Sequence, residues 1–192
     1  TAVAMTAAAI LSPWVIRNYL FFGKPIATTT HGGYTLYLGN NPLFYDWLKR
    51  DETDLPWDAR LFQARLWNRW STRPGWFRRS ELEFDEFCYK SASQAINDDR
   101  PMFWRACAYR ALQLWSPLPN KLTADESGRR RLLRYATCVW YVGVYAMAIV
   151  GVWRLCWELL RPPWIWGVLL CLAFMAVHTF YWTNLRMRAP LM

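Results

Sequence analysis

The sequence predicts a mainly α-helical fold: a polytopic membrane protein fragment with about three transmembrane helices and a largely helical extramembrane insert. Two runs, 135–153 and 164–182, contain no charged residue, and each has 19 residues. That is close to the roughly 20 apolar residues that a helix needs to cross a bilayer. By contrast, residues 17–134 contain 19 of the 23 Lys and Arg residues and 13 of the 14 Asp and Glu residues. A polar insert therefore precedes two apolar segments.

The chain begins with an apolar, Ala-rich stretch over residues 1–16. This stretch is shorter than a full membrane span. It also lacks the basic segment that precedes the apolar part of a signal peptide. We therefore interpret residues 1–16 as the end of a transmembrane helix in a fragment of a longer protein. Arg17 follows directly and marks the expected membrane surface.

The insert, residues 17–134, is predicted to be a loop followed by helices. Gly, Asn and Pro residues and a short β-prone run predict a loop over residues 17–57. Ser80 and Glu83 have the spacing of a helix-capping box, and Asp99 before a proline is a second helix start signal. The expected helices are about 58–72, 81–97 and 101–115.

The first of these helices has an apolar face made of Phe62, Leu66 and Trp70. Two interpretations of this face are open. It packs against neighbouring helices, or it lies in the membrane interface with its Trp side chain among the lipid headgroups.

A polar tail, residues 183–192, follows the last apolar run. If 135–153 and 164–182 both cross the membrane, two crossings separate the insert from this tail. The insert and the tail are therefore expected on the same side of the membrane, which brings together the two most polar ends of the chain.

Charge and cysteine content exclude two kinds of site. The net charge of +9 does not indicate a nucleic-acid partner, because basic and acidic residues alternate through the insert. The five Cys residues include no CxxC pair, so we predict no metal site and no bound cofactor in this fragment. Cys88 and Cys107 would form a disulfide only in an oxidising compartment, and the sequence leaves this open.

Short polar groups next to the apolar segments are the candidates for ligand binding. An Arg side chain offers two-point hydrogen bonding to a phosphate, and Gly-rich loops let the backbone approach a ligand. The alternative readings are a basic residue at the membrane surface and ordinary turn chemistry. The candidate substrate- and carrier-binding residues are Arg17, Asn18, His31, Gly32, Gly33, Asn40, Asn41, Arg186 and Arg188.

An ordered set of motifs runs through the beginning of the chain: Pro13-Trp14, Arg17-Asn18, Gly23-Lys24-Pro25, Thr28-Thr29-Thr30-His31-Gly32-Gly33-Tyr34 and Leu38-Gly39-Asn40-Asn41-Pro42. This set resembles the late membrane-loop region of bacterial membrane glycosyltransferases of the dolichyl-phosphate-mannose–protein mannosyltransferase type, which have the C-type glycosyltransferase fold. The ending, from His178 to Arg186-Met187-Arg188-Ala189-Pro190, is similar to that family's last span and its Arg-x-Arg-x-Pro-like tail. The resemblance covers about 30 residues at the start and about 15 at the end.

The resemblance implies a multi-pass enzyme of the bacterial inner (plasma) membrane that transfers a sugar from a polyprenyl-phosphate-linked donor on the extracytoplasmic face. In that family an acidic residue of the first extracytoplasmic loop is the expected catalytic base. Here that loop would lie upstream of Thr1, so the catalytic residues of this fragment are unknown. The implied partners are the polyprenyl-phosphate sugar donor, membrane lipids and the missing N-terminal part of the same enzyme. Use of a divalent metal by the full-length enzyme is left open.

Two questions stay open at this point. The arginines on the insert side would place the insert in the cytoplasm if the positive-inside bias were read literally. We expect the extracytoplasmic side, because a phosphate-binding site would account for those arginines. The alternative function is a non-catalytic membrane protein, such as a transporter or assembly subunit, whose insert binds a partner.

Overall fold

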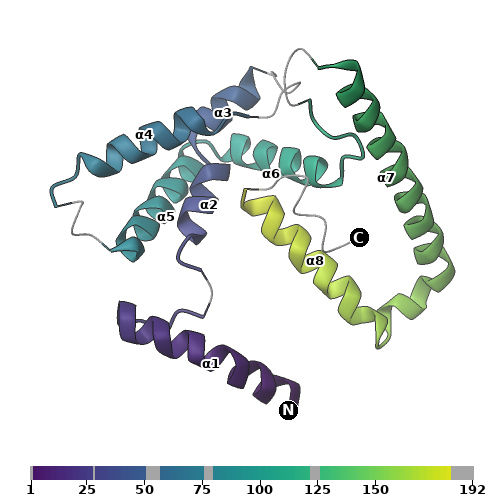
Figure 1. The fold of residues 1–192 in the computed structure, drawn as a ribbon, viewed down its shortest axis with the longest axis horizontal. Helices are drawn as coiled ribbons and strands as arrows, with labels where there is room; N and C mark the ends of the chain where they lie inside the picture. Colours follow the sequence, from purple (N-terminus) through teal and green to yellow (C-terminus); the bar gives the residue numbers. More distant parts are fainter. Residues whose placement is uncertain (1, 28, 51–56, 76–79, 122–125, 183–192) are drawn as a thin grey trace.

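The computed structural model describes residues 2–27, 29–50, 57–75, 80–121 and 126–182 of the chain (Figure 1). Every regular element in these ranges is a helix, so the predicted mainly α-helical fold is confirmed for the described residues. In chain order the elements are α1 (Ala2–Phe22), α2 (Gly32–Gly39), α3 (Pro42–Lys49), α4 (Arg60–Ser71), α5 (Glu81–Asp98), α6 (Arg100–Trp115), α7 (Gly128–Leu155), the short 3-10 helix η2 (Cys156–Leu160) and α8 (Trp164–Phe180).

The helices α4, α5 and α6 agree with the three predicted insert helices to within two residues at each end. Both predicted start signals are confirmed. The Ser80 hydroxyl accepts a hydrogen bond from the Glu83 N–H at 3.3 Å, and the Asp99 carboxylate accepts one from the Met102 N–H at 3.1 Å. Polar side chains at these positions satisfy N–H groups that have no partner within the first helical turn.

The predicted loop over residues 17–57 is wrong, because most of its described residues are helical. α1 continues to Phe22, and α2 and α3 follow. The β-prone run 34–37 lies inside α2, where contacts with α5 override the local preference of these residues. Asn41 and Pro42 do not prolong the loop. They start α3, with Pro42 in the first turn and Asn41 as its cap.

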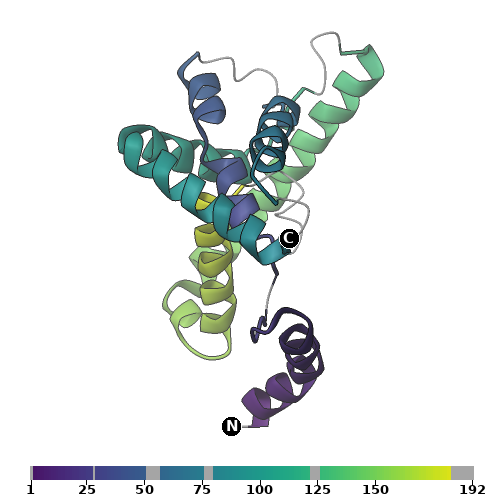
Figure 2. The ribbon, with the colours of Figure 1, turned by 90° about the vertical axis from the view of Figure 1, so that its left-hand side faces the viewer.

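Helices α2 to α6 enclose a core of their own. One buried cluster joins α2, α4 and α5, and a second joins α3 and α6. The face of α4 formed by Phe62, Leu66 and Trp70 is buried in the first cluster, so it packs against neighbouring helices. Trp57 and Trp182 pack against both clusters and link them. Figure 2 shows these helices gathered together, with α1 set apart from them.

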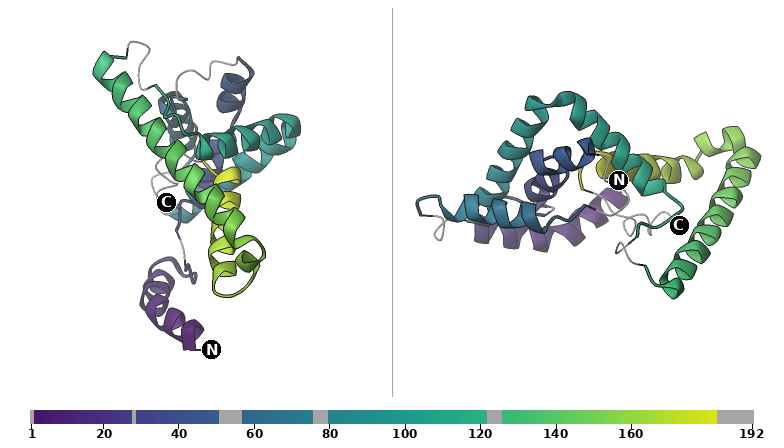
Figure 3. Two further views of the ribbon diagram at one scale, coloured as in Figure 1. Left: turned by 90° about the vertical axis from the view of Figure 1, so that its right-hand side faces the viewer. Right: turned by 90° about the horizontal axis from the view of Figure 1, so that it is seen from above.

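Helices α7 and α8 form an open hairpin whose turn points away from α2–α6 (Figures 1 and 3). Neither helix contains a buried residue within the described range 126–182, although both are rich in apolar side chains. The exposed Trp residues near the turn are Trp153, Trp157, Trp164 and Trp166. A Trp cluster at one end of an apolar helix pair is typical of a membrane–water interface.

Among the described residues, the stretch Gly128–Leu160 is the one helix long and apolar enough to cross a membrane, a weak indication taken alone. It contains the predicted span 135–153 but begins seven residues earlier, because the preceding arginines favour a helix as well. α8 is apolar but has 17 residues and ends at Phe180, two residues before the predicted end of the span 164–182. That residues 1–16 and 164–182 cross the membrane stays a prediction.

Both arms of this hairpin contact α6. The ring of Trp115 lies 5.9 Å from the ring of Tyr145 in α7, and the ring of Phe103 lies 6.2 Å from that of Phe180 in α8, measured between centroids. Trp182, just after α8, packs against the buried ring of Phe44 at 5.7 Å. The apolar hairpin is therefore fixed to the helical insert through the end of α8.

Candidate functional site

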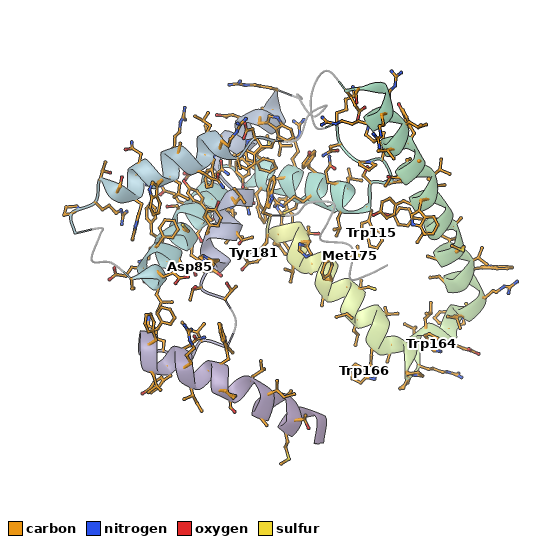
Figure 4. All side chains as sticks on the ribbon, in the orientation of Figure 1. Asp85, Trp115, Trp164, Trp166, Met175 and Tyr181 are labelled. Carbon is orange, nitrogen blue, oxygen red and sulfur yellow. The ribbon has the colours of Figure 1, made fainter. Side chains whose placement is uncertain are left out.

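The first turn of α2 is capped by a carboxylate from α5. Asp85 accepts hydrogen bonds from the N–H groups of Gly33 (2.7 Å) and Tyr34 (3.3 Å). Partial burial raises the pKa of the Asp85 carboxyl, while these two hydrogen bonds act in the opposite direction. Figure 4 shows Asp85 on α5 beside α2. A capping residue 51 or 52 positions away cannot be recognised from the local sequence of α2.

Gly32 and Gly33 lie where α2 packs closely on α5. A Cβ atom at Gly32 would overlap the hydroxyl of Tyr89, at the end of a side chain, and one at Gly33 would overlap the backbone carbonyl of Asp85. Gly33 therefore lets two helix backbones approach. Binding of a ligand by the N–H groups of the two glycines stays a prediction, and the N–H of Gly33 is already occupied by Asp85.

His31 precedes α2 and lies at the surface. Its side chain is 63% exposed, and its Nε2 atom lies 3.3 Å from Glu81 Oε1. The Thr30 hydroxyl donates a hydrogen bond to the same carboxylate. Glu81 thus orients the imidazole while leaving most of the ring accessible, so His31 has the exposure that a binding residue needs.

His31 lies at the edge of a groove with a volume of about 310 Å³. Three helices contribute its aromatic and apolar walls. Gln63 Nε2 donates a hydrogen bond to the Tyr34 hydroxyl at 2.9 Å, and Trp67 is 57% exposed. Mostly apolar walls with a few convergent polar groups are typical of small-ligand sites. The lining residues are His31, Tyr34, Gln63, Leu66, Trp67 and Phe84.

Asn40 and Asn41, at the other end of α2, are buried and fully engaged in hydrogen bonds. Asn41 Oδ1 accepts from the Phe44 N–H at 3.0 Å, and its Nδ2 donates to the carbonyls of Tyr37 and Leu38. Both asparagines are at most 1% exposed. Their role in the described structure is to end α2, start α3 and hold the two together. Ligand binding by these residues stays a prediction.

Arg110 on α6 was not identified as a functional candidate, although it occupies the centre of this junction at 1% exposure. Its guanidinium donates to the Gly39 carbonyl, to the Thr179 carbonyl at 2.7 Å and to Asn40 Oδ1 at 3.1 Å. Gly39 and Thr179 lie in the last turns of α2 and α8, where the helix dipole is negative. Carbonyl groups at the ends of two helices therefore bind the guanidinium in place of a carboxylate. Burial still lowers the pKa of Arg110.

One signal in the sequence indicates this arrangement. Met102, Ala106, Arg110 and Leu114 recur every fourth residue along α6 and are all buried. An Arg in an otherwise apolar row predicts a buried, hydrogen-bonded cation. The partners of that cation are separated by 69 to 71 positions and cannot be read from the sequence.

Arg17 and Asn18 lie on α1, away from the groove and the Arg110 junction (Figure 1). Arg17 is exposed, and its guanidinium carbon lies 5.4 Å from the centroid of the Trp14 ring. Asn18 is buried; it accepts from Arg17 at 3.1 Å and donates to the Ile26 carbonyl at 2.8 Å. Arg186 and Arg188 lie outside the described residues, so their predicted pairing with Arg17 stays a prediction.

The thiols of Cys88 and Cys107 are buried and not joined in a disulfide. Burial raises the pKa of Cys88 to about 12, so this thiol is an inert part of the core. Cys107 Sγ lies 3.3 Å from Arg110 Nη2. Within the described ranges, no three His, Cys, Asp or Glu side chains are grouped so as to hold a metal ion.

The described residues that the sequence singled out thus occupy three places. His31, Gly32 and Gly33 lie at the groove end of α2, Asn40 and Asn41 lie at the Arg110 junction, and Arg17 and Asn18 lie on α1. Comparison of the chain with protein-family models, with curated proteins and with solved structures gave no match. The resemblance to membrane glycosyltransferases therefore remains an expectation from the sequence.

Proposed function

We propose that this chain is the C-terminal part of an integral-membrane glycosyltransferase, and that the groove beside His31 holds a saccharide unit of its substrate. The groove is the observation that carries this proposal. An exposed indole ring offers a flat apolar surface to the C–H face of a sugar ring. His31 and Gln63 stand close enough to the same groove to hydrogen-bond sugar hydroxyls.

The volume and composition of the groove favour a single sugar ring. About 310 Å³ is at the lower end of the range for small-ligand pockets. The hydrogen bond from Gln63 to the Tyr34 hydroxyl uses the amide nitrogen of Gln63, and the amide oxygen is the group that would accept from a sugar hydroxyl. The groove residues bind the sugar and orient it. No carboxylate lines the groove in the described part of the chain.

In the proposed reaction the bond between the anomeric carbon and the carrier phosphate oxygen breaks, and a bond to the acceptor hydroxyl oxygen forms. The polyprenyl phosphate leaves with the electron pair, and the acceptor proton passes to a general base. We expect that base upstream of Thr1. The apolar hairpin α7–α8 and its exposed Trp residues support an integral-membrane location, and we propose a multi-pass arrangement in a bacterial inner membrane with the insert extracytoplasmic.

The test is sugar transfer by the intact membrane enzyme carrying Trp67→Ala. Loss of the stacking surface is expected to lower kcat/KM about fivefold, mainly through KM, because an aromatic contact contributes about 1 kcal/mol beyond its buried area. Trp104→Ala is the matched control, since Trp104 is 63% exposed on α6 and does not line the groove. Equal transfer by the two variants would reject the groove as the saccharide site.

A second candidate is a non-catalytic membrane protein whose insert binds a partner. One observation favours it. Gly33, Asn40 and Asn41 form hydrogen bonds within the fold, so the fold accounts for these motif residues without any substrate. This candidate predicts that purified intact protein transfers no sugar from polyprenyl-phosphate donors, whichever residue is mutated. Transfer activity that depends on the intact protein rejects it.

A further inference from the structure

A second hollow, with a volume of about 350 Å³, lies between α4 and α5 and is polar. It does not share a lining residue with the groove beside His31. Three cationic side chains face it together with hydroxyl and amide groups. The lining residues are Arg69, Arg73, Glu83, Glu86, Phe87, Lys90, Ser91 and Gln94.

Two of these cations are held in place by aromatic side chains. The guanidinium carbon of Arg73 lies 4.1 Å from the centroid of the Phe87 ring, and that of Arg69 lies 5.4 Å from the same ring. Phe87 is buried, and Arg69 also hydrogen-bonds with the hydroxyl of buried Tyr37. Cation–π contacts of this kind fix a guanidinium without neutralising its charge.

The carboxylates of the hollow do not neutralise the positive charges of these two arginines. Glu86 forms an ion pair with Lys90 at 2.7 Å, which leaves Arg69 and Arg73 facing Glu83 alone. Among the described residues, neither arginine forms an ion pair. Three positive and two negative side chains give the hollow a net charge of one positive unit.

We infer that this hollow binds a phosphate group, either as free phosphate or as the phosphate monoester of a lipid headgroup. Arg69 lies in the last turn of α4 and Arg73 lies just after the end of that helix, and both guanidinium groups lie against the same Phe87 ring. Their planar donor groups match the oxygen pairs of a tetrahedral oxyanion. The Ser91 hydroxyl and the Gln94 amide supply further donors. Charge, donor geometry and preorganised side chains therefore all favour the same ligand class.

The first experiment is calorimetric titration of inorganic phosphate into the purified full chain in a neutral detergent. Arg69→Gln/Arg73→Gln is expected to raise the dissociation constant on the order of a hundredfold, roughly tenfold for each charge-assisted interaction. Arg65→Gln is the matched control, because Arg65 is exposed on the same helix and does not line the hollow. It should bind phosphate as the unmodified chain does.

Three results would overturn the inference: no phosphate binding by the unmodified chain, equal loss in the Arg65 control, or undiminished binding by the double variant. If circular dichroism shows that the double variant does not fold, the variant Arg69→Lys/Arg73→Lys tests the inference instead. This pair keeps both charges but lacks the planar fork, so it should bind with intermediate affinity. Affinity equal to that of the unmodified chain would contradict specific recognition by the guanidinium groups.

The source of the phosphate is distinguished by repeating the titration in lipid nanodiscs. Nanodiscs of phosphatidylcholine alone should leave the binding heat unchanged. If a lipid headgroup fills the hollow, nanodiscs that also contain phosphatidic acid should abolish that heat by competition. Unchanged heat in both assigns the hollow to soluble phosphate. Because the titration contains no sugar, its result is independent of glycosyl transfer.

Discussion

Arg110 joins parts of the chain that are distant in the sequence. Its guanidinium binds carbonyl groups at the ends of α2 and α8 and the side chain of Asn40. Gly39 and Asn40 are buried, and the hydrogen bond to Thr179 is partly buried. A buried cation is tolerable only when its donors are satisfied, and here that condition fixes the relative positions of three helices.

Arg110→Met is therefore expected to lower the free energy of unfolding by about 3 kcal/mol. Methionine fills much of the same volume but leaves the buried Gly39 carbonyl and the partly buried Thr179 carbonyl without their donor. A buried polar group left unsatisfied costs about 1–3 kcal/mol. The thermal midpoint of the purified chain in detergent measures this loss. Arg65→Met removes an exposed Arg and should change the midpoint little. A drop of the same size in both would mean that the buried hydrogen bonds of Arg110 contribute nothing.

At the scale of a helix, α2 depends on α5. Its eight residues are too few for a helix that is stable alone. The Asp85 cap and the packing of Gly32 and Gly33 supply what the local sequence does not. The stability of α2 should therefore respond to the ionisation of a side chain on a different helix.

The pH dependence of this cap has a definite sign. Burial raises the pKa of Asp85 in the folded chain, while the nearby charges of His31 and Glu81 act on it in opposite directions. A raised carboxyl pKa contributes stability that is present below the ordinary value near 4 and is lost as pH rises through the folded value. Asp85→Asn keeps a side-chain oxygen that can accept from both N–H groups. Because asparagine does not ionise, the variant does not lose this stability as pH rises. Its thermal midpoint relative to the unmodified chain should rise as pH increases above about 4.

A carboxylate with the opposite shift provides the control. The ion pair with Arg60 lowers the pKa of Asp58, so its contribution is present above the ordinary pKa and lost as pH falls through the lower folded value. Asp58→Asn should therefore become relatively less stable as pH rises. If both variants shift in the same direction with pH, burial of Asp85 does not control its ionisation.

The helices could be predicted where their signals are local. Ser80 and Asp99 start α5 and α6 as expected, and the buried face of α4 follows from the spacing of Phe62, Leu66 and Trp70. α2 could not be predicted, because its cap comes from Asp85 and its glycines are explained only by the neighbouring helix.

The candidate site was predictable in part for the same reason. His31 was identified from its loop-like sequence and lies in the groove. Gln63, Trp67 and Phe84 were missed as site residues, since only packing brings α4 and α5 to His31. Asn40 and Asn41 were singled out by residue type, but type alone does not distinguish a ligand contact from a buried cap.

At the scale of the whole molecule, the insert and the hairpin turn should lie on opposite sides of the membrane. Both arms of the hairpin contact α6, whereas Cys156 is exposed at the turn. In intact cells a membrane-impermeant maleimide should label Ser93→Cys on the exposed face of α5 and spare Cys156, if the insert is extracytoplasmic. The two cysteines are compared in variants in which the other native cysteines are replaced by serine or alanine.

The reverse pattern would place the insert in the cytoplasm, as the positive-inside bias suggests. Labelling of both positions in intact cells would contradict a membrane-crossing hairpin altogether. Permeabilised cells, in which both thiols should react, control for accessibility. The outcome decides the side of the groove and of the phosphate-binding hollow together, because both lie on α4 and α5.

The position of α2 has one further consequence. Its eight residues span about 12 Å, with His31 and the groove at one end and the Arg110 junction at the other. We expect so short a helix to move as one unit. A displacement of its His31 end when the groove fills would then strain the hydrogen bond between Gly39 and Arg110 at the other end. Because Arg110 also binds the Thr179 carbonyl in the last turn of α8, filling of the groove is expected to affect the end of the apolar hairpin.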